Sequence, residues 1–237
     1  MIGYISSFIA FALCTFVYIR MVRREEPKTL GKKSIIPAVF GLVSPIFAFF
    51  LVILLKKMTV GLSVQNPVLK ALANAFLGAG FTEELTKLLF ALIAVAIVKP
   101  RTVYSYALMF IGVGYGFTLL EEVLYGGGND LFSLARLPGF ALHMVFNMIM
   151  GVNLGIAKFK KKQGADGGAM NIVAAFVLPV IWHTVYDAAT VDNPGLEAES
   201  NIAIVIALAV SVISVVLQFI MLSNFKKKSQ GYCQMEF

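Results

Sequence analysis

Residues 80–90 read GFTEELTKLLF and place two adjacent carboxylates, Glu83 and Glu84, and the ammonium group of Lys87 inside a long apolar run. The run continues to residue 98, and a helix of about 20 mostly apolar residues is long enough to cross a bilayer. An ionisable side chain at the centre of such a helix costs at least ~2.5 kcal/mol to insert. We therefore expect these groups to face other helices, to have partners and to serve a function.

The composition of the whole chain indicates the same environment. Hydrophobic residues make up 59% of the 237 residues and charged residues 14%, and the mean hydropathy is +0.83. Soluble domains carry about 25% charged residues. We expect an all-α, polytopic transmembrane helix bundle that forms a single integral membrane domain over residues 1–237 and has the lipid bilayer as its surroundings. The two cysteines, Cys14 and Cys233, exclude a disulfide framework or a cysteine metal cluster.

Seven apolar windows are long enough to span a membrane, and polar or Gly- and Pro-containing segments separate them. The windows are residues 2–22, 35–55, 74–98, 104–125, 136–157, 171–191 and 202–223. Helices are favoured over barrel strands because the windows are about twice as long as a tilted strand and show no alternation. The segment 61–73 is compatible with an interfacial helix that leads into the third window.

The distribution of Lys and Arg predicts the orientation, since basic loops stay in the cytoplasm. With the N-terminus outside, the inner loops hold fifteen basic residues and the outer loops four. We therefore expect a multi-pass membrane protein with an outside N-terminus and a cytoplasmic C-terminus. This topology accounts for the net charge of +7. No soluble basic face with interleaved aromatic residues is present, so no nucleic-acid partner is expected.

Polar residues remain inside four of the windows, and both histidines of the chain are among them. They are Glu83, Glu84, Lys87, Glu121, Glu122, His143, Asn147, His183 and Asp187. With a rise of about 1.5 Å per residue, they fall in one layer about 6 to 14 Å below the same membrane face. The charge distribution makes this the extracytoplasmic face. The four helices of residues 70–190 are thus expected to form a catalytic core around one polar pocket.

Helical spacing suggests partners within this layer. Glu83 and Glu84 lie four and three residues before Lys87, but neighbouring residues point about 100° apart, so one glutamate pairs with Lys87 and the other faces the pocket. His183 and Asp187 are four residues apart, which allows the carboxylate to orient the imidazole. Four glycines are expected to permit close helix contact. They are Gly112, Gly116, Gly151 and Gly155.

Two imidazoles and several carboxylates in a dry pocket are typical of hydrolysis. Two histidines and one carboxylate form a known zinc ligand set with an open position for water, and a further glutamate can accept the proton of that water. A proton- or cation-coupled transporter uses similar residues. Transporters usually show inverted repeats and interrupted helices, and neither is found in this sequence.

Four stretches on successive windows, EELTK, GYGFTLLEEVLY, ALHMVFNMIMGVNLGIAK and WHTVYD, resemble the PrsW family of intramembrane proteases. The resemblance covers residues 70–190. The E-E-x-x-K motif of the family falls on residues 83–87, its F-x-x-x-E motif on Phe117 and Glu121, and its histidines on His143 and His183. It implies hydrolysis of a peptide bond in or beside the membrane. Family members are known for cutting membrane-bound anti-sigma factors on the extracytoplasmic side, so the expected partner is a single-pass membrane protein substrate.

Residues and resemblance together give a mechanistic hypothesis. His143, His183 and Glu121 are expected to bind Zn²⁺, and Glu83 or Glu84 is expected to act as general base. A metal-free variant uses the same residues, with a glutamate and a histidine activating water directly.

Three further polar residues have supporting roles in this hypothesis. Lys87 holds the second glutamate, Asp187 orients His183, and Asn147 donates a hydrogen bond to the oxyanion. The distant CAAX-type prenyl-protein endopeptidases are an alternative with related chemistry. They carry histidine at the position of Glu121 and act on cytoplasmic tails.

Overall fold

The protein is described by a computed structural model in which the described residues are helical, apart from connections and one isolated antiparallel bridge between Thr102 and Glu236. The description covers residues 2–58, 65–125, 137–190 and 227–237, with six single positions between 209 and 223. The predicted all-α class is confirmed for these parts of the chain.

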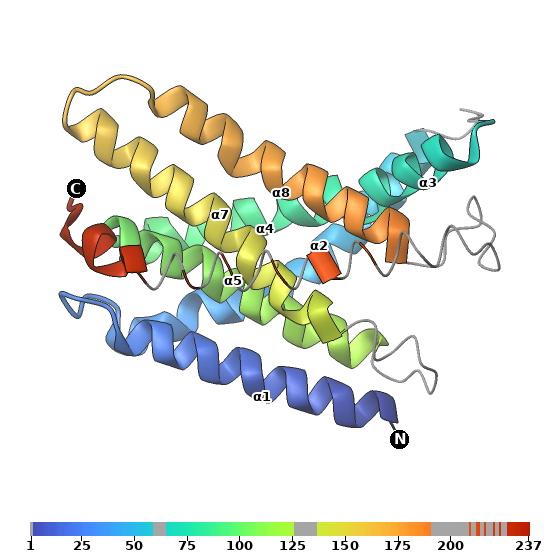
Figure 1. Cartoon of the computed structure of the whole chain (residues 1–237), viewed down its shortest axis with the longest axis horizontal. Helices are drawn as coiled ribbons and strands as arrows, with labels where there is room; N and C mark the ends of the chain where they lie inside the picture. Colours follow the sequence, from blue (N-terminus) through green and yellow to red (C-terminus); the bar gives the residue numbers. More distant parts are fainter. Residues whose placement is uncertain are drawn as a thin grey trace.

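Helices occupy six of the seven predicted windows. They are α1 (Ile2–Arg23), α2 (Ile35–Met58), α4 (Phe81–Val98), α5 (Val103–Tyr125), α7 (Leu137–Lys162) and α8 (Gly168–Thr190). Figure 1 shows α7 and α8 as an antiparallel pair joined by a short loop. Within the described residues, four helical stretches are long and apolar enough to cross a membrane: 31–58, 103–121, 142–162 and 168–188. The seventh window, 202–223, lies almost wholly outside the described residues.

A helix precedes the third window, in the segment 61–73 where the sequence is compatible with one, and the helix type changes within the window. A short helix, α3 (Pro67–Ala75), starts where the Asn66 side chain accepts a hydrogen bond from the Leu69 amide at 3.1 Å. The next five residues, η2 (Phe76–Gly80), are wound as a π-helix, and α4 follows directly. Such π-helical turns are rare and often lie at functional sites. This one ends three residues before Glu83, the first of the two adjacent glutamates of α4.

Helix α5 lies at the centre of the bundle, packed between α2 and α7. Its residues 103–114 are buried throughout. A Cβ atom on Gly116 would collide with the main chain of Ala38 in α2, and one on Gly151 of α7 would lie 2.7 Å from Cα of Ala107. The prediction that small residues permit close contact between these helices is confirmed at both positions.

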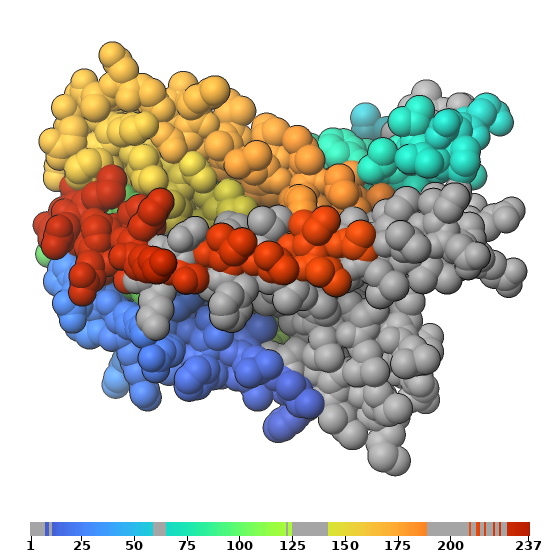
Figure 2. Space-filling view, in the orientation of Figure 1, coloured from blue at the N-terminus to red at the C-terminus, as the bar shows by residue number. Residues whose placement is uncertain are grey.

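One end of the bundle gathers the α1–α2 connection, the α7–α8 loop and the C-terminal residues (Figure 1). The amide of Val103 donates to the carbonyl oxygen of Met235 at 3.0 Å, and the amide of Phe237 donates to that of Arg101 at 2.9 Å. The ammonium group of Lys158 lies 4.0 Å from the centroid of the Phe237 ring. Figure 2 shows the C-terminal residues in red, on the surface beside α1 in blue and α7 in yellow. Most basic residues of the connecting segments therefore lie at this one end.

We predict that Gly116→Ala lowers the free energy of unfolding in detergent micelles by about 1–3 kcal/mol, because overpacking forces α2 and α5 apart. The matched control is Gly78→Ala in η2, where an added Cβ meets no atom within 4 Å. Equal midpoints of unfolding for the two variants would contradict the close α2–α5 contact.

Candidate active site

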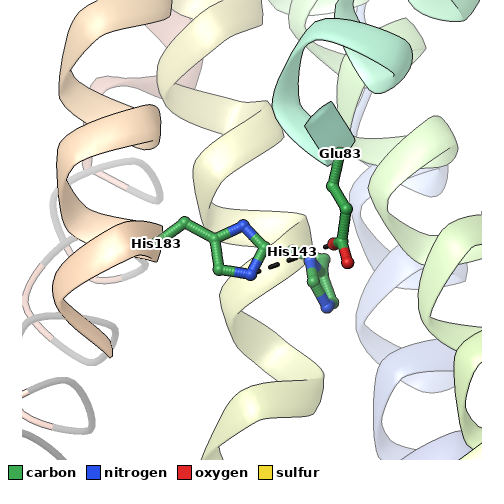
Figure 3. Close-up of side chains that lie close together, drawn as sticks. All are labelled: Glu83, His143 and His183. Carbon is green, nitrogen blue, oxygen red and sulfur yellow. Dashed lines mark ion pairs between the residues drawn. The ribbon is translucent and has the colours of Figure 1, made fainter. Parts of the chain in front are cut away.

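Four helices bring polar side chains together inside the bundle. The cluster consists of Glu83, Glu84 and Lys87 of α4, Glu121 of α5, His143 and Asn147 of α7, and His183 and Asp187 of α8. Figure 3 shows Glu83, His143 and His183 pointing toward one another from three helices. The side chain of Glu122 lies outside the described residues. Side chains as far apart in the sequence as Glu83 and Asp187 thus meet in one cluster.

Glu84 lies at the buried centre of this cluster. Its Oε1 atom lies 2.6 Å from Nζ of Lys87 and 2.7 Å from Nδ1 of His183, and all three side chains are almost fully buried. Since a carboxylate only accepts hydrogen bonds, Lys87 and Nδ1 of His183 are the donors. The carboxylate of Glu84 therefore sets the orientation of the His183 imidazole, as acidic partners do for metal-binding histidines.

The ring of His143 is held on both sides. Its Nδ1 lies 2.8 Å from Nζ of Lys87, and its Nε2 lies 2.6 Å from Oε2 of Glu121. A lysine ammonium can only donate, so Nδ1 is the acceptor and Nε2 carries the proton that is donated to Glu121. The imidazole is thus neutral in this arrangement, and its two nitrogens have different partners.

Glu83 faces the space between the two histidines. Its Oε2 lies 3.6 Å from Nζ of Lys87 and 3.9 Å from Nε2 of His183. This oxygen is buried and accepts no hydrogen bond. Glu83, His143 and His183 each place one potential ligand atom within 4.8 Å of the other two. Among the described residues, this trio has the spacing to hold a metal ion. Glu121, expected from sequence as a ligand, instead contacts Nε2 of His143.

Asp187 and Asn147 lie at the edge of the contacts that hold the two histidines. Oδ2 of Asp187 lies 3.6 Å from Nε2 of His183, beyond hydrogen-bond distance, whereas Glu84 bonds the other nitrogen. The Asn147 amide donates to the main-chain oxygen of His143 at 2.9 Å, and its Oδ1 is buried without a hydrogen bond. The orienting role of Asp187 and the oxyanion role of Asn147 stay predictions.

Two phenylalanines form the walls of the cluster. The ring centroids of Phe117 and His143 lie 5.0 Å apart, and those of Phe146 and His183 lie 5.3 Å apart. A Cβ on Gly114 would collide with the carbonyl oxygen of His143, so glycine is what lets α5 approach α7 here. Sequence reasoning missed Phe146 and Gly114. Their available signals were an apolar residue three positions after a histidine and a small residue in an apolar helix, and both are common in any bundle.

Comparison with known proteins agrees with this geometry. The family model of the PrsW family intramembrane metalloproteases matches residues 33–219, which are most of the chain. The chain belongs to the PrsW family. It is therefore a membrane-embedded protease, and the resemblance seen in the sequence is confirmed. Neither a curated protein nor a solved structure matches the chain.

Membership in the PrsW metalloproteases implies a metal ion, and the residues present fit one. Two imidazoles and a carboxylate are a suitable donor set. The buried Oε2 of Glu83, which has no hydrogen bond, is the kind of atom that a cation would satisfy. Glu83 and His183 offer atoms for such an ion, and His143 would complete the set by giving up the partner that one of its nitrogens now has, Lys87 at Nδ1 or the proton shared with Glu121 at Nε2.

We predict that Lys87→Met lowers the free energy of unfolding by about 3–5 kcal/mol, because it leaves buried carboxylate charge unpaired. Adding Glu84→Gln removes that charge, so the double variant should recover part of the loss, a coupling that a double-mutant cycle measures. Lys161→Met, at an exposed position of α7, is the control and should change stability by less than about 0.5 kcal/mol. Strict additivity of the two single losses would show that the ion pair contributes nothing.

Proposed function

We propose that the protein is an endopeptidase that cuts a single-pass, membrane-anchored protein near the extracytoplasmic side of the membrane. The observation that carries this proposal is the trio of Glu83, His143 and His183 inside a bundle of apolar helices. One potential ligand atom of each side chain lies within 4.8 Å of the other two. Because these three side chains lie between membrane-spanning helices, they are placed to act on peptide bonds within or beside the bilayer. From the resemblance of its motifs, the proposed substrate class is a membrane-bound anti-sigma factor.

The proposed orientation has the N-terminus outside, the C-terminus in the cytoplasm and seven spanning helices. The gathering of basic segments at one end of the bundle supports it, because positively charged connections stay cytoplasmic (Figure 1). The first turns of α4 and the last turns of α8 carry the site residues, and both lie away from that end. The proposed membrane is the plasma membrane of a bacterium or archaeon.

The proposed metal is Zn²⁺, with His143, His183 and Glu83 as its ligands. When bound, zinc supplies Lewis acidity, which lowers the pKa of water and polarises a carbonyl group. The grouping of these three side chains supports Glu83 as third ligand, in place of the Glu121 expected from the sequence. Glu84 is proposed to position His183, because its Oε1 contacts both Lys87 and Nδ1 of His183.

Glu121 then becomes the proposed general base. Its side chain is about one-fifth exposed, which gives it access to water, and Oε2 lies 2.6 Å from Nε2 of His143. In the proposed reaction the oxygen of water adds to the scissile carbonyl carbon and the C–N bond breaks. Glu121 takes the proton from water and passes it to the leaving nitrogen. Glu84 holds the imidazole of His183 in position, and Phe117 and Phe146 limit the entry of further water.

The two glutamates have different expected phenotypes. Glu83→Gln should lose bound zinc and activity together, because it removes a ligand. Glu121→Gln should keep zinc close to one ion per chain but lose about 10²–10⁴-fold in kcat, as expected for a general base. Metal analysis of purified protein and cleavage kinetics measure both. Zinc loss in Glu121→Gln with retention in Glu83→Gln would restore the assignment expected from the sequence.

The proposed cleavage can be tested in cells. Expression of the wild-type chain should create new N-termini in single-pass membrane proteins near their outer membrane boundary, as detected by mass spectrometry of labelled termini. The matched control is Glu121→Gln expressed to the same level, which should create none. Identical termini in both samples, or cuts confined to cytoplasmic tails, would contradict the proposal.

A further inference from the structure

The ammonium group of Lys87 is buried completely, so every side of it must be covered by protein. In water this group is strongly hydrated and has three protons to donate. Inside the bundle, Oε1 of Glu84 lies 2.6 Å away, Nδ1 of His143 lies 2.8 Å away, and Oε2 of Glu83 lies 3.6 Å away. These polar contacts cover only part of the ammonium surface.

An aromatic face covers another part. The centroid of the Phe117 ring lies 4.3 Å from Nζ of Lys87, well within the distance of a cation–π contact. The same ring packs against His143, with centroids 5.0 Å apart and an angle of 47° between the planes. Phe117 is 2% exposed. It therefore touches both partners of the hydrogen bond between Lys87 and His143.

The position of this ring follows from the packing of α5. Gly114, one turn earlier on α5, permits the main chain of α7 to come close at His143. Phe117 can then reach between α7 and α4 to the lysine. The negative face of an aromatic ring attracts a cation, and the attraction grows where water is excluded. An aliphatic side chain of similar volume would exclude water equally well but would offer no such attraction.

We propose that Phe117 is a positioning residue for the hydrolytic reaction: its ring face holds the Lys87 ammonium between Glu84 and His143. Through that ammonium and Glu84, which bonds both Lys87 and His183, it acts on the imidazole of His183. The F-x-x-x-E motif includes Phe117 but does not say what its ring contributes. The inference rests on the proposed function only in its effect on cleavage, because the contact between ring and ammonium is a property of the fold.

Fluorinated phenylalanines test this inference, since successive fluorines weaken the negative ring face while leaving the shape nearly unchanged. Incorporated at position 117, mono-, di- and trifluorophenylalanine should lower kcat stepwise, reaching about tenfold with three fluorines, or about 1.4 kcal/mol. KM should stay constant, because the inferred role of Phe117 is to hold Lys87 and the ring itself is 2% exposed. The matched control is Phe110, which lies two turns earlier on the same helix, is fully buried and stacks on Tyr106. The series at position 110 should leave kcat unchanged.

A second readout does not depend on activity. The same series at position 117 should lower the free energy of unfolding stepwise in the wild-type background and leave it level in a Lys87→Met background. Equal slopes in the two backgrounds, or a constant kcat in an active enzyme, would overturn the inference. If the stability slopes differ as expected but the unmodified protein cleaves no membrane protein, the proposed function fails while the interaction of Phe117 with Lys87 stands.

Discussion

A charged group surrounded by apolar helices must find its counter-charges and hydrogen-bond acceptors within the protein, and Lys87 shows how this constraint organises the fold. Its ammonium contacts Glu84 on its own helix, His143 on α7 and the ring of Phe117 on α5. Glu84 in turn bonds His183 on α8. Four helices are thus linked through one buried cation. Removing any one partner leaves another polar group unsatisfied at a depth where water cannot replace it.

The packing around this cluster explains how polar contacts can be so short in an apolar bundle. Glycines on α5 let α2 and α7 approach its main chain, and Gly80 at the end of η2 lies against Thr184 of α8. The π-helical turn between α3 and α4 sets the rotation of the residues that follow it, which include Glu83 and Glu84. As a result Glu84 is fully buried, whereas Glu83 faces the histidines. Two adjacent and chemically identical side chains acquire different environments.

Several of these features could be predicted from the sequence because they depend on local spacing. The apolar windows predict the helices, and the three- and four-residue intervals in E-E-x-x-K predict a glutamate–lysine pair. The depth of each polar residue also predicts that four helices converge. Which glutamate pairs with Lys87 depends on the rotation of α4. That rotation is affected by the preceding π-helical turn, which no residue pattern predicts.

Contacts between helices were less accessible to sequence reasoning. Asp187 has the right spacing to orient His183, yet the bond comes from Glu84, ninety-nine positions away. The packing of Phe146 on His183 likewise requires the crossing of α7 and α8 to be known. Whether side chains of two helices meet depends on the distance between the helices and on the rotation of each. Both depend on how many apolar side chains pack together along the whole interface.

In the proposed site, His143 and His183 share one metal ion with a carboxylate in the middle of this bundle. X-ray absorption spectroscopy of the purified, zinc-loaded protein tests it most directly, because multiple scattering counts the imidazole rings bound to the metal. We expect nitrogen and oxygen ligands, with two imidazoles in the wild type and one in either His143→Ala or His183→Ala. Sulfur ligands, or a spectrum that neither substitution changes, would contradict it.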